Sequence, residues 1–233
     1  MVAWQQRGPL WCLDPAGAGR QLEFIGGSYL AATPQISYRR LLEALADRGW
    51  QVRAWSYVPG FDHQGQANDA WRAFRAERPD GPKPLRLGHS LGCKLHLLAP
   101  DGGRGACGLV ALSFNNFSAE RSVPLLADMG QQFGFRSEFS PSPAETLRLV
   151  GQGYRQPRNL LVRFNRDGLD QSRRLLPVLQ ERPQDASQLQ ELPGDHLTPA
   201  SAGLRRNLLG DWADDPARQR QMERLADLVH GWA

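Results

Sequence analysis

One serine lies in a pattern that could do nucleophilic chemistry. Gly88 and Gly92 stand two residues before and two residues after Ser90, which is the GxSxG pattern of a nucleophile elbow. In such an elbow the chain turns sharply from a strand into a helix, so the flanking positions must be small. Leu85 and Leu87 predict the strand. Because a serine hydroxyl is a weak nucleophile alone, it also needs a base and a carboxylate within reach.

A histidine and two aspartates follow Ser90 in the order nucleophile, acid, base that α/β-hydrolases use. Asp167 and Asp170 both lie in the turn after an expected strand, Asn159–Phe164. We predict Asp167 as the acid because it stands three residues after the strand end, whereas Asp170 better suits the cap of the next helix and is the second choice. His196 follows the last expected strand and would take the proton of Ser90.

Acyl chemistry also needs two backbone N–H groups that stabilise the negative charge of the tetrahedral intermediate. Leu91, directly after the serine, would supply the first. The second would come from the loop after an earlier strand, where Ser28 is the preferred donor and Tyr29 the reserve. We expect four residues to line the substrate pocket: Gly26, Gly27, Tyr29 and His89.

The remaining candidate residues do not form a cofactor-binding or metal-binding pattern, so we expect neither a cofactor nor a metal. The glycines of the early loop lack the third glycine of a dinucleotide fingerprint. Asp62 and His63 are adjacent and have no further ligands at helical spacing, so a structural turn beside the site is favoured over a metal pair. His96 stands six residues after Ser90, which places it on another side of the helix.

The elements that would position these residues alternate between strand and helix. Gln21–Ile25, a helix over 38–46 and Gln51–Trp55 form a crossover unit, which predicts a parallel sheet. Leu10–Leu13 is an earlier strand, and the turn-rich segment Asp14–Gly19 predicts that it forms a hairpin with Gln21–Ile25. The expected fold class is α/β, a mostly parallel sheet of the α/β-hydrolase type with helices on both faces.

The later chain continues this alternation with one interruption. Residues 115–157 are rich in proline and phenylalanine, which suggests a cap inserted into a single domain over 1–233. A capping box at Ser142 and Glu145 opens a helix inside it. Its apolar residues would suit an acyl chain or simply pack on the sheet: Leu125, Leu126, Phe133, Phe135 and Phe139. The remaining expected elements are a helix Asn68–Arg75, strands Gly108–Phe114 and Gln188–Leu192, and helices Gln171–Leu179 and Pro216–His230.

Composition narrows the possible partners. The chain has 233 residues, 41% of them hydrophobic, without a membrane-length apolar run or a signal-like N-terminus, which predicts a cytoplasmic protein without an integral membrane segment. The net charge is +4, but the basic residues are scattered among acids, so a nucleic-acid partner is not expected. Cys12, Cys93 and Cys107 lack metal-ligand spacing and are expected to be reduced. The oligomeric state stays open.

Several segments together resemble the domain-of-unknown-function family 1350 of cyanobacteria and plant plastids. The resemblance covers about Gln21 to Pro199, and it implies an α/β-hydrolase fold and an esterase or lipase activity. It rests on Phe24–Gly27, Thr33–Arg39, Phe61–His63, Gly88–Ser90, Asp167–Gln171 and Gly194–Pro199.

Two functions remain open from the sequence. The first is a serine hydrolase acting on small-molecule or lipid esters or thioesters through an acyl-enzyme on Ser90. The second is a non-catalytic protein of the same fold that binds a lipid, a pigment or a protein partner, because one fold hosts unrelated functions. Acyl transfer to an acceptor other than water is a third possibility that the residues do not separate from hydrolysis.

Overall fold

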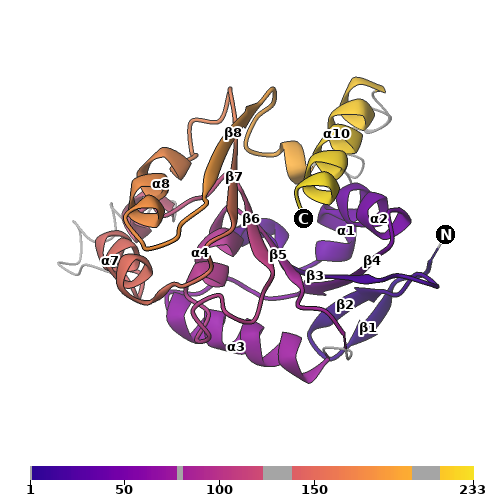
Figure 1. Ribbon diagram of the computed structural model, residues 1–233, viewed down its shortest axis with the longest axis horizontal. Coiled ribbons are helices and arrows are strands. Elements are labelled where there is room, and N and C mark those ends of the chain that lie inside the picture. Colours follow the sequence, from indigo (N-terminus) through magenta and orange to yellow (C-terminus); the bar gives the residue numbers. More distant parts are fainter. Residues whose placement is uncertain (1, 78–80, 123–137, 201–215) are drawn as a thin grey trace.

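The computed structural model describes residues 2–77, 81–122, 138–200 and 216–233. Within them, eight strands form one sheet in the order β1-β2-β4-β3-β5-β6-β7-β8 (Figure 1). Along this order, neighbouring strands are parallel from β4 to β8, as predicted. The pairs β1–β2 and β2–β4 are antiparallel. The bounds are Gln5–Arg7 (β1), Leu10–Leu13 (β2), Arg20–Ile25 (β3), Trp50–Trp55 (β4), Leu85–His89 (β5), Gly108–Leu112 (β6), Asn159–Phe164 (β7) and Gln188–Leu192 (β8).

The prediction of a hairpin between the second and third strands is wrong. β2 pairs with β1 and β4, whereas β3 pairs with β4 and β5. The crossover from β3 through α2 (Arg39–Asp47) delivers β4 into the position between them. The six residues Asp14–Gly19 are long enough to span the distance of about 10 Å between β2 and β3, which β4 separates. A turn-rich segment therefore does not by itself make its flanking strands neighbours.

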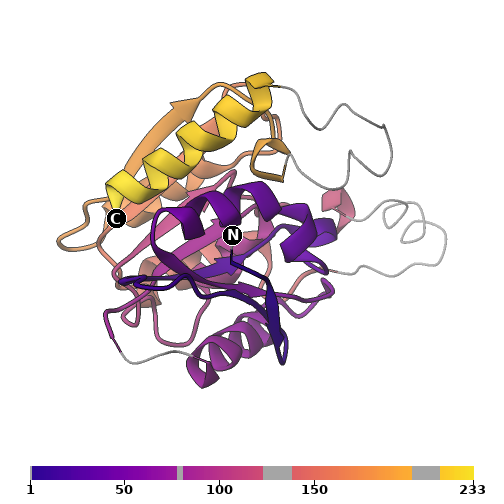
Figure 2. The ribbon, with the colours of Figure 1, turned by 90° about the vertical axis from the view of Figure 1, so that its right-hand side faces the viewer.

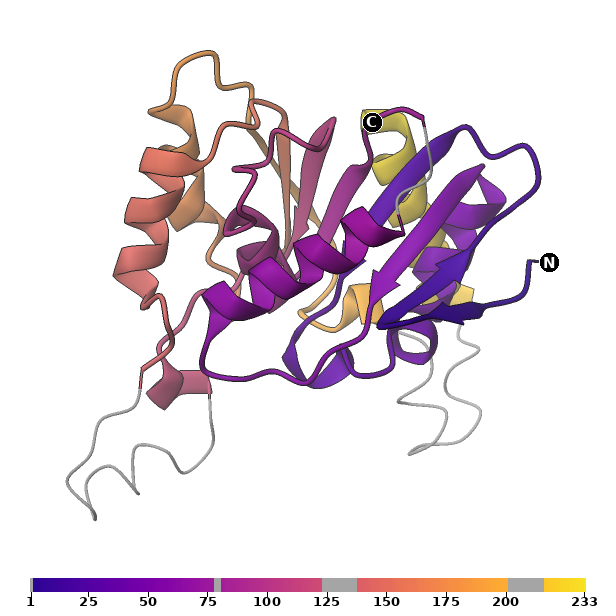
Figure 3. The same ribbon diagram turned by 90° about the horizontal axis from the view of Figure 1, so that it is seen from below.

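Helices cover both faces of the sheet (Figures 1 and 3). One face packs against α2 and α10 (Pro216–Trp232), which lie side by side (Figure 2). The other packs against α3 (His63–Ala76), α4 (Leu91–Leu97), α7 (Pro143–Gly153) and α8 (Ser172–Gln180). Short helices are α1 (Pro34–Ser37), α5 (Ala119–Ser122), η1 (Ser28–Leu30) and η2 (Thr198–Ala200).

Alternation along the strands explains why both faces are buried. In β6, Leu109 and Ala111 pack with α7 and α8, while Val110 and Leu112 pack with α2 and α10. Successive strand residues point to opposite faces, so a central parallel strand such as β6 buries apolar side chains on both faces. No helix in the described ranges has the length and apolar character to cross a bilayer.

Part of the expected cap belongs to the sheet layer. Ser142 caps α7 through a bond from the Glu145 N–H, as the capping box predicts. Val150 and Tyr154 are buried against β6, β7 and α8, so α7 packs as a crossover helix rather than as part of a cap. Four expected cap residues, Leu125, Leu126, Phe133 and Phe135, lie outside the described residues. The remaining extent of the insertion stays a prediction.

Candidate active site

Ser90 stands on a strained turn between β5 and α4. Its φ and ψ are 54° and −119°, which non-glycine residues rarely adopt. A Cβ at Gly88 would lie 2.7 Å from the Cys93 backbone nitrogen, and a Cβ at Gly92 would lie 2.0 Å from the Ile25 carbonyl oxygen. Both glycines are therefore required because backbone passes against backbone. The strand, turn and helix predicted around GxSxG are confirmed.

A continuous hydrogen-bonded chain links Ser90, His196 and Asp167. Ser90 Oγ lies 3.1 Å from His196 Nε2, and His196 Nδ1 lies 2.9 Å from Asp167 Oδ2. Burial raises the pKa of Asp167, but His196, the Ser113 hydroxyl and Leu169 N–H together lower it below its ordinary value, so the carboxyl is ionised and accepts. Nδ1 then carries the proton, and Nε2 is free to accept one from the serine. The structure brings together the three residues predicted as nucleophile, base and acid, and their catalytic roles stay predictions.

Asp170 has a different set of contacts. Its carboxylate accepts from the backbone N–H and the hydroxyl of Ser172, at 3.0 and 2.8 Å, where α8 begins. Burial raises its pKa. Asp170 thus holds the start of a helix while Asp167 contacts the imidazole, which favours Asp167 as the acid.

The early loop lies directly against the serine. A Cβ on Gly27 would be 3.0 Å from Ser90 Cβ, so this backbone contacts the elbow. Gly27 N–H donates to the Tyr38 hydroxyl at 2.8 Å. Within the described part of the chain, the N–H groups of Ser28 and Leu91 have no acceptor. They remain available as the two predicted oxyanion donors. Tyr29, the reserve, extends to solvent with 76% of its surface exposed.

His89 joins that loop to the base. Burial, helped by the nearby His196 ring, lowers the pKa of His89 to about 3, so the ring is neutral. Its Nε2 lies 2.9 Å from the His196 carbonyl and must donate, so Nδ1 accepts from the Tyr38 hydroxyl at 2.8 Å. The chain Gly27 to Tyr38 to His89 to His196 therefore fixes two loops relative to each other. Tyr38 was missed because nothing in its sequence neighbourhood indicates this contact.

A pocket of about 910 Å³ opens beside Ser90. Of the four expected lining residues, Gly27, Tyr29 and His89 line it. Gly26 does not, because it lies against the Tyr38 ring, where a Cβ would come within 2.6 Å. Apolar side chains contribute much of the wall, among them Phe61, Phe117, Phe139, Leu169 and Leu197.

The polar residues of the wall that were not predicted as site residues include His63 and Lys94. Asp62 caps α3 by accepting from Gly65 N–H at 2.8 Å, as a structural turn would, but His63 faces the pocket. Lys94 also lines it. The signal for Lys94 was present in the sequence: it follows Ser90 by four residues and so shares its side of the helix. In the described ranges no three His, Cys, Asp or Glu side chains gather in a way that could hold a metal ion.

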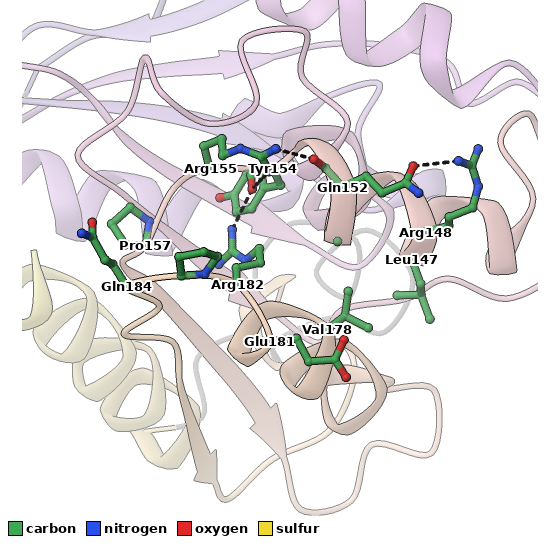
Figure 4. Close-up of a pocket in the computed structure, with 12 residues that line it drawn as sticks. Leu147, Arg148, Gln152, Tyr154, Arg155, Pro157, Val178, Glu181, Arg182 and Gln184 are labelled. Atoms are coloured by element: carbon green, nitrogen blue, oxygen red, sulfur yellow. Dashed lines mark hydrogen bonds between the residues drawn. The ribbon is translucent and has the colours of Figure 1, made fainter.

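A second pocket, also of about 910 Å³, lies between α7 and α8 (Figure 4). Its arginines already have partners within the protein. Arg148 donates to the Gln152 side chain, Arg155 to the Gln152 carbonyl and Arg182 to the Tyr154 carbonyl. These contacts stabilise the ends of the two helices, and the pocket holds no nucleophile beside a base.

Several α/β-hydrolases of known structure share this fold. The monoacylglycerol lipase of Paleococcus ferrophilus has a TM-score of 0.63 at 14% identity, over 96% of this chain and 99% of the lipase. A thioesterase domain from the curacin biosynthetic pathway has 0.62 at 14%, over 98% of each chain. A serine hydrolase involved in carbazole degradation has 0.61 at 15%, over 99% of this chain and 98% of the hydrolase. Identities this low show the fold alone.

Sequence comparison gives a family rather than an activity. The model of the family described as protein of unknown function (DUF1350) matches residues 3–214. No curated protein matches the chain.

Proposed function

Because the chain belongs to the DUF1350 family and has the fold of α/β-hydrolases, we propose that it is a serine hydrolase that cleaves carboxylic esters or thioesters. The observation that carries this proposal is the hydrogen-bonded chain from Ser90 through His196 to Asp167 beside an open pocket. Neighbouring structures include a lipase, a thioesterase and a serine hydrolase, which is consistent with this chemistry.

The reaction would begin with attack by Ser90 Oγ on the carbonyl carbon, while His196 Nε2 takes the hydroxyl proton. Asp167 stabilises the imidazolium that forms, and the N–H groups of Leu91 and Ser28 stabilise the oxyanion. The intermediate collapses to an acyl-enzyme as His196 gives the proton to the leaving alcohol or thiol. Water then attacks, with His196 again as base, and the carboxylic acid leaves as Ser90 regains its proton.

A fluorophosphonate probe tests the nucleophile directly. The native protein should be labelled, and Ser90→Ala should lose both labelling and ester hydrolysis, the latter by about 10³-fold or more. Ser122→Ala is the matched control because this serine lines the same pocket without contacting His196. The proposal is wrong if native protein is not labelled, or if Ser90→Ala is labelled as strongly.

The alternative is a non-catalytic protein that binds a lipid, a pigment or a protein partner. The exposed apolar side chains at the pocket, Tyr29, Phe61, Leu169 and Leu197, would suit it. The hydrogen bond between Ser90 and His196 argues against it, because a binding pocket does not need a base on the serine. Unlabelled native protein that binds a lipid ester unchanged would favour this alternative.

A further inference from the structure

The pocket beside Ser90 contains a buried cation. Lys94 is 1% exposed, and its Nζ donates to the Pro141 carbonyl at 3.0 Å and lies 5.8 Å from the centre of the Phe139 ring. Among the described residues no carboxylate lies within 4 Å of it, although Glu138 is near enough to raise its pKa. Burial dominates and lowers the pKa of Lys94 to about 8, so the ammonium is still charged at pH 7. A buried charge without a close anionic partner is costly, so an anion bound in the pocket would stabilise the Lys94 ammonium.

His63 supplies a second polar group in the same wall. The ring is 3% exposed and stacks on Phe139, with centroids 4.2 Å apart. Its Nδ1 is buried and, among the residues that the structure describes, has no hydrogen-bond partner. Burial and the Lys94 charge lower the pKa of His63 to about 3, so the ring is neutral and can donate one hydrogen bond. Buried polar atoms usually have partners, so an orphan beside a cation indicates a ligand position.

The sheet order shows which arm of an ester would reach these groups. His63 follows β4, on one side of the elbow strand β5, whereas His196 follows β8 on the other side. His196 must hand its proton to the leaving group, which therefore lies on the His196 side of Ser90. The acyl arm then extends along α4, where Lys94 stands one helical turn after Ser90, with about 5–6 Å between such Cβ atoms.

We propose that the acyl arm of the substrate carries a terminal carboxylate that pairs with Lys94 and accepts a hydrogen bond from His63. The substrates are then monoesters or monothioesters of short dicarboxylic acids. The apolar side chains that line the pocket would accommodate the methylenes, and the ion pair would fix the far end. This inference rests on the proposed hydrolase function and specifies its substrate class.

The test compares two substrates that differ only in the distal charge. Mono-p-nitrophenyl adipate and the p-nitrophenyl methyl diester of adipic acid have the same acyl length and the same leaving group. The native protein should favour the acid by at least about tenfold in kcat/KM, which a single charge-assisted hydrogen bond can supply. The glutarate and succinate pairs then give the preferred length.

Variants assign the preference to Lys94. In Lys94→Met the kcat/KM values for the acid and for the methyl diester should become equal within about threefold, and Lys94→Arg should recover part of the preference for the acid. Lys83→Met is the matched control, because it makes the same change at an exposed lysine outside the pocket. Adipate binding by native protein, measured by calorimetry against dimethyl adipate, gives a readout that needs no variant.

The outcomes separate the two proposals. If the diester is hydrolysed through Ser90 but the acid is not favoured, or if Lys94→Met keeps the preference, the dicarboxylate inference is wrong and the hydrolase stands. The dicarboxylate inference is also wrong if the protein prefers substrates whose negative charge is on the leaving group rather than on the acyl arm. If Ser90 is neither labelled nor active, the hydrolase proposal fails, and adipate binding lost in Lys94→Met would then support an anion-binding pocket alone.

Discussion

Asp167 and Asp170 are three residues apart in the sequence, but their carboxylates make different contacts. Asp167 is at the end of a turn that begins at Phe164, and its carboxylate is held by Leu169 N–H at 2.8 Å and by His196. Asp170 points back to Ser172 and the start of α8. The difference comes from which neighbours each carboxylate meets, because both are substantially buried.

We expect Asp167→Asn to lower kcat for a p-nitrophenyl ester by about 10³–10⁴-fold, because an amide favours the wrong tautomer of the base. Asp170→Asn is the matched control and should change kcat by less than about threefold, since its amide oxygen can still accept from Ser172. Steady-state kinetics and circular dichroism of both variants give the comparison. A larger loss in Asp170→Asn would assign the acid to Asp170.

The elbow depends on contacts between whole elements rather than between side chains. α4 begins so close to β3 and β5 that Gly92 touches the Ile25 carbonyl and Gly88 touches the backbone of Cys93. Ser90 N–H donates to the Leu112 carbonyl of β6 at 2.9 Å, which holds the turn to the next strand. The strained backbone of Ser90 persists because three strands and a helix surround it.

Gly92→Ala should lower the free energy of unfolding by about 3 kcal/mol or more, because the methyl group must displace backbone. Gly153→Ala is the control: it places a methyl at the end of α7, where nothing lies within 4 Å, and should change stability by less than about 1 kcal/mol. Urea unfolding measures both. Equal stability of the two variants would contradict the close approach at the elbow.

At the scale of the whole molecule, one buried charge cluster connects distant parts of the chain. Arg86 of β5 is 2% exposed, bonds Glu23 of β3 at 3.2 Å and makes a two-pronged contact with Asp101 at 2.9 and 2.7 Å. Burial would raise the pKa of Asp101, but the Arg86 bonds and the N–H groups of Gly103 and Gly105 lower it to about 2 from an ordinary 3.8.

This cluster predicts that the free energy of unfolding falls at acid pH. The pKa of Asp101 is lower in the folded chain, so its contribution is present above about pH 4 and is lost as the pH falls toward 2. The shift corresponds to about 2 kcal/mol. Between pH 5 and pH 2, the free energy of unfolding of native protein should fall by about 2 kcal/mol more than that of Asp101→Asn, because the asparagine side chain does not titrate. Urea unfolding of both proteins across this pH range measures the difference. Parallel losses would show that Asp101 contributes nothing to the fall at acid pH.

Features that depend on local interactions can be predicted from the sequence. The elbow follows from small residues on each side of Ser90, because the steric demand of a strand-to-helix turn acts over a few positions. The crossover from β3 to β4 and the amphipathic α10 follow from hydrophobic spacing. The family resemblance is confirmed, and the chain order of Ser90, Asp167 and His196 anticipated the contact that the fold makes between them.

Contacts between distant segments, in contrast, could not be predicted from the sequence. Nothing between Leu13 and Arg20 indicates that β4 lies between β2 and β3, because strand pairing depends on where the chain returns after a helix. The link from Tyr38 to His89 joins residues 51 positions apart. Lys94 and His63 come from different helices and line the same pocket, and among the described residues His63 Nδ1 has no hydrogen-bond partner. Local sterics and periodicity act within a segment, whereas burial and charge pairing are properties of the assembled fold.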